Sequence, residues 1–163
     1  MPAKFSDDEI NRMIMERKPL PPNYHPRIQL REKRGHKECE LDVAGADGNQ
    51  YRIILRQSNF NLLDFSVILA VSPKDSNQLF RLRRYNGKNH EHTNQIECQT
   101  YYDFHIHQAT ERYQDSGARE DTYAEPTNRY ADLHSALDCM IADCGFELPS
   151  GDQTLLRLGE FEP

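Results

Sequence analysis

The run FSVILAV at residues 65–71 is the most apolar stretch of the chain, and it decides the fold. It is short and nearly continuous, which is typical of a strand buried at the centre of a sheet. The turn-forming sequence SPKDSN follows at residues 72–77. Because a membrane-spanning helix needs about 20 apolar residues, the run predicts the core of a β-sheet and no membrane segment.

The segments on either side of this run alternate apolar and polar residues, which is the pattern of half-buried strands. The alternation returns after each turn, at residues 28–30, 39–43, 51–55, 79–85, 96–98 and 102–107. We therefore expect an antiparallel, curved sheet of about six strands.

Helical patterns stand at both ends of this sheet region. Ser6 and Glu9 form a capping box, and apolar residues at 10, 13 and 14 predict a helix from about residue 7 to 17. Apolar residues recur at helical spacing again over residues 129–143. The fold class is therefore α+β, with an N-terminal and a C-terminal helix beside the sheet.

The length of 163 residues suits one domain, because domains usually run about 100–200 residues. We divide the chain into an N-terminal helix (1–18), a proline-rich connector (19–26) and a single α+β domain (27–163). Residues 114–128 are polar and contain Gly and Pro, so we expect an exposed loop there. Leucines at 155–158 predict a short final strand.

The chain carries 20 Lys and Arg against 26 Asp and Glu, for a formal net charge of −6. This balance excludes a protein that coats duplex nucleic acid nonspecifically, since such binding needs a broad cationic face. The charge is uneven, because residues 80–89 hold four basic residues and no acidic one. The N-terminus lacks a signal sequence, and the four cysteines form no CxxC pair, which favours a cytoplasmic protein with reduced thiols.

Two histidine pairs, His90 with His92 and His105 with His107, lie within 18 residues of each other. Side chains at i and i+2 of a strand point to the same face, so each pair can present two imidazoles side by side. On the strand at 102–107 we expect the apolar face to point inward and the histidine face outward. Such imidazoles suit either divalent-metal binding or acid–base catalysis on a phosphodiester. The simpler alternative is a solvated strand face.

Basic and aromatic residues around the histidines complete the predicted site. Arginine binds phosphate and stabilises its developing charge, while tyrosine relays a proton or stacks on a base. The predicted catalytic residues are His90, His92, His105, His107, Tyr85 and Tyr113. The predicted phosphate-binding residues are Arg83, Arg84, Lys88 and Arg112. This acid–base scheme needs no cofactor, and a divalent metal at the histidine pairs is the alternative.

The run RYNGKNHEH at residues 84–92 resembles the TumE-type toxins of toxin–antitoxin systems and related small prokaryotic domains. Those domains carry a similar aromatic, glycine and histidine run after a strand, in a short sheet flanked by helices. The resemblance covers about residues 50–145 and implies action on RNA, with a DNA-binding antitoxin as partner. The positions that carry over are Tyr85, Gly87, His90 and His92. This chain departs from that family in its N-terminal helix and its acidic charge.

Our leading hypothesis is a small cytoplasmic protein that acts on RNA, as a toxin-like, metal-independent endoribonuclease of a toxin–antitoxin or defence locus. The alternative is a non-enzymatic protein of a phage or mobile element, whose acidic surface binds a nucleic-acid-handling enzyme. A structural metal site is a third option. An exposed sheet edge would favour a homodimer.

Overall fold

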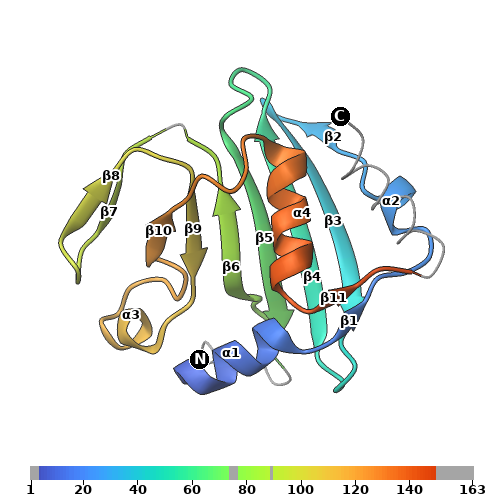
Figure 1. Ribbon diagram of the computed structural model, residues 1–163, viewed down its shortest axis with the longest axis horizontal. Helices are drawn as coiled ribbons and strands as arrows, with labels where there is room; N and C mark the ends of the chain where they lie inside the picture. Colours follow the sequence, from blue (N-terminus) through green and yellow to red (C-terminus); the bar gives the residue numbers. More distant parts are fainter. Residues whose placement is uncertain (1–3, 74–76, 89, 150–163) are drawn as a thin grey trace.

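The computed structural model describes residues 4–73, 77–88 and 90–149, and it confirms the α+β class (Figure 1). The helices are α1 (Asp7–Met15), α2 (Tyr24–Arg27), α3 (Glu111–Asp115) and α4 (Leu133–Asp143). The strands are β1 (Lys18–Pro19), β2 (Arg31–Lys33), β3 (His36–Ala44), β4 (Gln50–Ser58), β5 (Phe65–Ser72), β6 (Phe80–Asn86), β7 (His92–Asn94), β8 (Gln99–Tyr101), β9 (His105–Gln108), β10 (Ala124–Pro126) and β11 (Phe146–Glu147). The predicted final strand at 155–158 lies outside the described residues.

The main sheet has seven strands in the order β10-β9-β6-β5-β4-β3-β2, and all neighbours are antiparallel. The apolar run at 65–71 forms β5, which lies at the centre of the sheet as predicted. Two smaller pairs accompany it: β1 runs parallel to β11, and β7 and β8 form a separate hairpin.

Three sequence-based expectations about this sheet were wrong. Residues 28–30 are not a strand, because they form the irregular connection between α2 and β2. Residues 96–98 are not a strand, because they lie in the turn between β7 and β8. Residues 114–128 are not a continuous loop, because they contain β10, which pairs with β9. A strand at the edge of a sheet needs hydrogen bonds on one side only, so β10 accommodates Pro126 despite its missing N–H.

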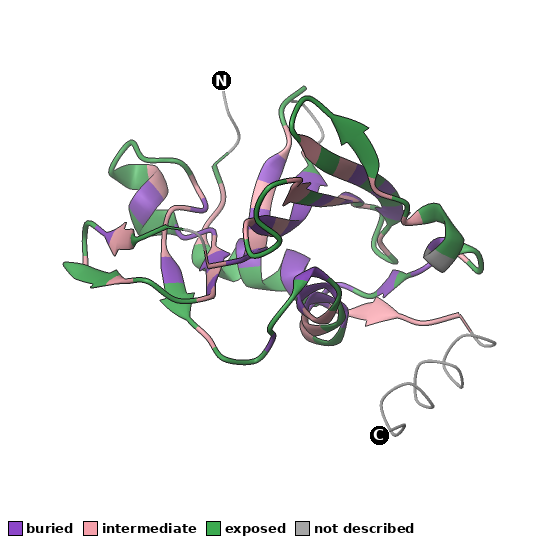
Figure 2. Cartoon of the chain, turned by 90° about the horizontal axis from the view of Figure 1, so that it is seen from above, coloured by how far each residue is buried: buried purple, intermediate pink, exposed green. Residues whose placement is uncertain are grey.

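Helices α1 and α4 cover one face of the sheet. The buried residues of α4 point toward the sheet when the helix is seen end-on (Figure 2). The helix begins at Leu133 and not at 129, because Asp132 caps it by accepting from the Ser135 amide. Ile10 and Ile14 of α1 belong to the same hydrophobic core as the sheet.

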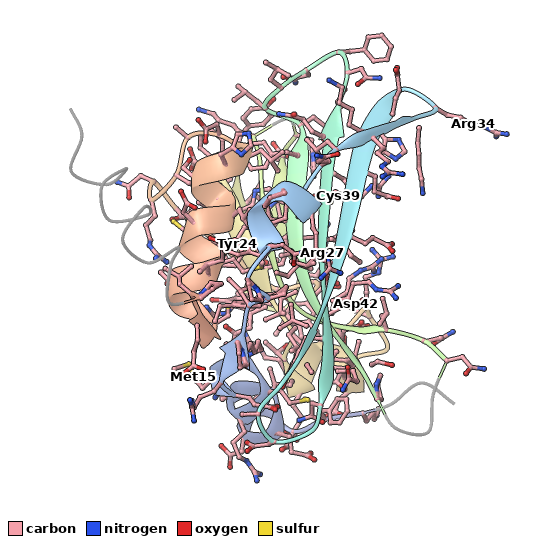
Figure 3. The ribbon with its side chains drawn as sticks, turned by 90° about the vertical axis from the view of Figure 1, so that its right-hand side faces the viewer. Met15, Tyr24, Arg27, Arg34, Cys39 and Asp42 are labelled. Carbon is pink, nitrogen blue, oxygen red and sulfur yellow. The ribbon has the colours of Figure 1, made fainter. Side chains whose placement is uncertain are left out.

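The proline-rich segment at 19–26 packs along the sheet and contains the start of the short helix α2. Tyr24 is buried in the core, and the Cys39 thiol of β3 donates to the carbonyl of Arg27 (3.6 Å), which draws α2 against that strand (Figure 3). Among the described residues, no helix combines the length and apolar character that a membrane crossing requires.

A buried lysine joins the C-terminal ends of α1 and α4. Lys18 is 0% exposed. Its Nζ lies 2.7–2.9 Å from the carbonyl oxygens of Met13, Ile14, Glu16 and Cys144. Carbonyl groups at helix C-termini carry partial negative charge, and they therefore stabilise an ammonium. The ammonium also lies 4.5 Å from the ring centroid of Tyr51 in β4. Burial lowers the pKa of Lys18 to about 8.

We expect Lys18→Met to lower the free energy of unfolding by about 2–4 kcal/mol at pH 7, because four carbonyl oxygens lose their donor. The difference between wild type and variant should widen from pH 8 to pH 9.5. In that range the unfolded lysine, with its ordinary pKa of 10.5, keeps its proton while the folded one releases it, so the wild type gains stability. Urea unfolding followed by circular dichroism measures both effects.

The exposed Lys4→Met substitution is the control for this experiment, and it should change stability little at either pH. A difference between wild type and Lys18→Met that shrinks from pH 8 to pH 9.5 would contradict the lowered pKa.

Candidate metal centre

Strand β9 directs His105 and His107 to the sheet face opposite the helices, while Ile106 between them packs against the core. The apolar-inward part of the expectation is therefore right. The histidine face, however, is not exposed to solvent: His105 and His107 are only 1% and 4% exposed. The reason is that the β7–β8 hairpin folds over them, with the rings of His92 and Tyr101 against His105.

One buried amide fixes this hairpin to the sheet. Asn94 is 0% exposed, and its Nδ2 donates to the carbonyl of Ala124 (2.6 Å), while its Oδ1 accepts from the Ala124 amide (3.0 Å). The side chain thus satisfies both backbone polar groups of a residue in the edge strand β10. At the hairpin turn, the Glu97 carboxylate accepts from the Tyr113 hydroxyl and from Nε of Arg112, each at 2.6 Å.

The hairpin brings three histidines into one cluster. The ring centroids of His92 and His105 are 5.3 Å apart and stacked, and both rings lie 4.9 Å from that of His107. The three can each offer one ring nitrogen, and these nitrogens lie within 4.8 Å of one another. A single metal ion requires such a convergence of donor atoms.

The hydrogen bonds of the three rings fix which nitrogen each can offer. Nδ1 of His105 lies 2.7 Å from the carbonyl of Asp103, and Nδ1 of His107 lies 2.8 Å from that of Asp121. Nε2 of His92 lies 2.8 Å from Oδ1 of Asn94, whose orientation is fixed by Ala124. An oxygen of this kind only accepts, so each of these ring nitrogens must carry the proton.

In the neutral form of each ring the other nitrogen therefore keeps its lone pair: Nδ1 of His92, and Nε2 of His105 and of His107. Metal-bound histidines in proteins nearly always donate their second N–H to a carbonyl or carboxylate in this way. Nε2 of His105 is buried and has no hydrogen-bond partner among the described residues. A buried nitrogen with an unused lone pair is costly unless a ligand occupies it.

The charge state of the buried rings suits a metal. The pKa of His105 is lowered to about 4, chiefly by burial and also by the nearby His92, His90 and Arg84, while its hydrogen bond to the Asp103 carbonyl acts in the opposite direction. Burial and Arg84 also lower the pKa of His107. Both imidazoles are therefore neutral at pH 7, and only the neutral ring can bind a metal.

Two further residues border the cluster. The exposed His90 places its ring 6.0 Å from that of His105, on the solvent side of the cluster. Arg84 of β6 is the register partner of His107, and its Nε donates to Oδ2 of the buried Asp121 (3.1 Å). A guanidinium thus lies beside the cluster and is held by the same residue whose carbonyl orients His107.

The structure places the other predicted site residues elsewhere. Tyr85 and Arg83 point to the helix-covered face, where the Tyr85 hydroxyl donates to Asp143 of α4 (2.7 Å) and Nη1 of Arg83 donates to the Tyr85 hydroxyl (3.3 Å). Tyr113 and Arg112 hold the hairpin turn. Lys88 follows β6, and its backbone amide donates to the carbonyl of Leu63 (2.8 Å).

Sequence reasoning missed Asn94 and Asp121, the two residues that orient His92 and His107. Asn94 stands two positions after His92, which places both on the same side of β7. That spacing is a usable signal, but its partner Ala124 lies 30 residues away. Asp121 acts on His107 through its backbone carbonyl, and no side-chain pattern reveals such a contact.

Comparison of the chain with protein-family models, with curated proteins and with solved structures finds no match in any of the three. The resemblance of residues 84–92 to TumE-type toxins therefore stays a prediction.

We expect Asn94→Ala to lower the free energy of unfolding by about 1–3 kcal/mol, because both polar groups of Ala124 lose a buried partner. Hydrogen exchange should accelerate over residues 92–101 and at Ala124. Mass-spectrometric hydrogen exchange measures this, with Thr93→Ala on the outer side of the same strand as control. Unchanged protection of the hairpin in Asn94→Ala would contradict the anchoring role.

Proposed function

We propose that the protein binds one divalent transition metal, zinc in the first place, through His92, His105 and His107. One observation carries the proposal: all three rings donate one N–H to a carbonyl oxygen, and one ring nitrogen of each lies within 4.8 Å of those of the other two. Solvated histidines would not need such matched hydrogen bonds, and acid–base catalysts would not need three rings packed together.

The donor set favours zinc and its neighbours over the harder cations. Imidazole nitrogen suits Zn²⁺, Cu²⁺, Ni²⁺ and Co²⁺, whereas Mg²⁺ and Ca²⁺ prefer carboxylate and carbonyl oxygen. Within the described residues, the ligand group consists of three histidines. Three protein ligands leave one position of a tetrahedral zinc for water or substrate, which is the arrangement of catalytic rather than structural zinc sites.

Hydrolysis is the chemistry that this arrangement supports, because zinc lowers the pKa of a bound water to about 7. Arg84 donates one N–H to Asp121, and its other N–H groups can donate to an anionic substrate beside His107. His90, on the solvent side, is placed to exchange a proton with that substrate. RNA is the substrate class that the sequence suggests, and an antitoxin-like partner and a homodimer likewise stay predictions.

A metal-dependent route replaces the metal-independent scheme in this proposal. His105 and His107 are buried and neutral, and their Nδ1 protons are engaged with backbone carbonyls. Such rings are poorly suited to shuttle protons to a polymer in solvent. Tyr85 and Arg83 lie on the other face of the sheet and cannot join the same reaction.

The metal is tested with chelator-treated protein titrated with Zn²⁺ and Co²⁺. We expect one ion per chain, a rise in Tm of at least about 5 °C at saturating zinc, and visible absorption from the Co²⁺ form. His92→Ala and His107→Ala should each abolish stoichiometric binding, and the exposed His134→Ala is the matched control. Because His107→Ala can affect folding, the metal content of the hairpin variant His92→Ala decides whether the ligand set is right. Stoichiometric metal in His92→Ala would overturn the ligand set.

Activity is tested separately, by incubating the zinc form and the chelated form with single-stranded RNA. The expected result is cleavage that zinc restores and that His92→Ala lowers by at least about 100-fold. Cleavage that survives chelation would overturn the metal-dependent route, and no cleavage in either form would overturn RNA hydrolysis while leaving the metal site standing.

A further inference from the structure

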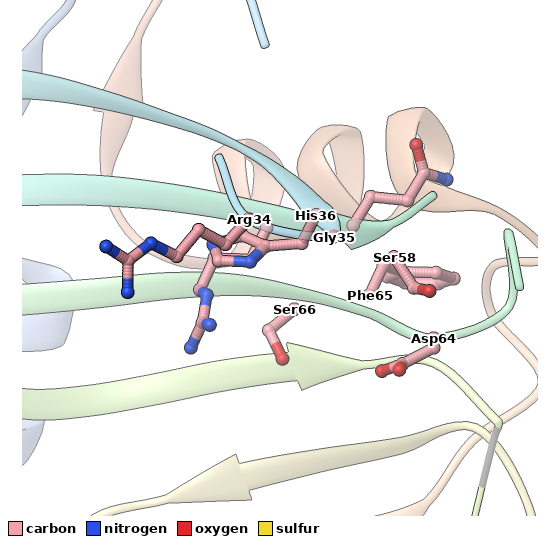
Figure 4. Close-up of a pocket in the computed structure, with 9 residues that line it drawn as sticks. Arg34, Gly35, His36, Ser58, Asp64, Phe65 and Ser66 are labelled. Carbon is pink, nitrogen blue, oxygen red and sulfur yellow. The ribbon is translucent and has the colours of Figure 1, made fainter. Parts of the chain in front are cut away.

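A second polar site lies on the same sheet face as the histidine cluster, toward the other edge of the sheet. It is a pocket of about 300 Å³ between the β2–β3 turn and the β4–β5 loop. The polar residues that line it include Arg34, His36, Arg56, Ser58, Asp64 and Ser66 (Figure 4). None of these residues belongs to the proposed metal site.

The pocket has more positive than negative charge. The carboxylate of Glu38 is shared by Lys33 (2.7 Å), Arg56 (3.3 Å) and His36 (3.8 Å). Among the described residues, no carboxylate forms a salt bridge with Arg34. One acid therefore serves several bases, and an anion would find the donors of Arg34, which no carboxylate of the described residues engages, beside those N–H groups of Arg56 that do not face Glu38.

Asp64 limits where an anion can sit. In Figure 4 the Arg34 side chain extends past the ring of His36 on one side, whereas Asp64 lies at the opposite end of the pocket. A bound anion would therefore lie at the Arg34 end, near the Ser66 hydroxyl, and Asp64 would weaken its binding by repulsion.

An aromatic ring stands at the edge of this pocket. Phe60 is 89% exposed, and a methyl group built on Gly35 would lie 3.6 Å from its ring. The main chain that carries this ring is fixed: the Phe60 amide donates to the Ser58 hydroxyl (3.0 Å), and the Asn59 amide donates to the Gly35 carbonyl (3.1 Å). A ring that buries so little of its surface in the protein is suited to stack on a flat ligand.

The sheet register connects the pocket to the histidine cluster. Arg56 pairs with Ser66, Ser66 with Asn86, and Asn86 with His105. Directly paired residues of antiparallel strands share a face, so these four form one row across the sheet. Three strand spacings of about 4.8 Å place Arg56 roughly 14 Å from His105.

We propose that this pocket binds the phosphate of a nucleotide through Arg34 and Arg56, with the base stacked on Phe60. Guanidinium groups match a phosphate with paired N–H donors, and stacking on an aromatic ring tolerates any base. The site does not depend on the metal. If the ligand is a single-stranded polynucleotide, the row from Arg56 to His105 gives its path toward the histidine cluster.

The test is binding by protein kept in chelator, so that failure of the metal proposal does not affect it. The probes are a fluorescently labelled short single-stranded RNA, and unlabelled AMP, adenosine and inorganic phosphate as competitors. We expect micromolar affinity for the RNA, competition by AMP that exceeds that of adenosine or phosphate, and a linear fall in log affinity with log salt. If AMP displaces the labelled RNA when the two are present at equal molar concentration, the ligand is a free nucleotide. If a large excess of AMP is needed, the ligand is the polymer.

Substitutions make the test specific. Arg34→Gln and Arg56→Gln should each weaken binding about 5- to 20-fold and reduce the salt slope by about 1. Phe60→Ser should weaken binding by a similar factor without changing the slope, and Asp64→Asn should strengthen it. The matched control is Arg12→Gln, an exposed arginine on α1, which should leave binding unchanged. Unchanged affinity for the RNA in both arginine variants would overturn the site. Unchanged affinity in Phe60→Ser would show that the pocket binds only the phosphate and that no base stacks on the ring.

Discussion

The buried ammonium of Lys18 ties the ends of two helices to one side of the sheet, and the arrangement of the molecule follows from this junction. Its donors reach the last carbonyls of α1 and also the carbonyl of Cys144 after α4, a residue 126 positions beyond Lys18 in the chain. The backbones meet so closely there that a side chain on Gly145 would collide with the carbonyl of Glu16. Once both helices end at this point, one sheet face is closed by helices and the other is left for the hairpin.

Because side chains alternate along a strand, the core residues and the site residues of the same strand point to opposite faces of the sheet. On β6, Arg83 and Tyr85 face the helices and join a network with Asp143, whereas Arg84 faces the histidines. On β9, Ile106 faces the core while its neighbours form the proposed metal centre. A shift of one residue in either strand would exchange these sets, so the buried core that specifies the register also positions the histidines.

The acidic net charge of the protein is compatible with the two proposed sites, one for a metal cation and one for a phosphate. The reason is that the charge close to each site differs from the net charge of the whole chain. Glu38 serves three bases near the β2–β3 turn, and Asp121 serves a single arginine beside the histidines. Arg34 and Arg84 thus place positive charge at two points of one sheet face. Such a distribution permits recognition of a single phosphate group but gives no broad cationic surface.

Much of the fold could be predicted from the sequence, because its signals are local. The capping box at Ser6 and Glu9 starts α1, the run at 65–71 forms the central strand, and the i, i+2 spacing of His105 and His107 directs them to one face. These features depend on neighbours within a few residues, whose geometry is fixed by backbone periodicity.

The site itself was decided by tertiary structure. Burial of the histidines requires the hairpin to fold back over β9, and its buried anchor is the Asn94 side chain, which binds the backbone of Ala124. Ala124 presents the same amide and carbonyl as any other residue, so no sequence pattern marks it as a partner. The sequence by itself determined which residues could bind a metal, and only the long-range packing determined that three of them meet and that two of them are buried.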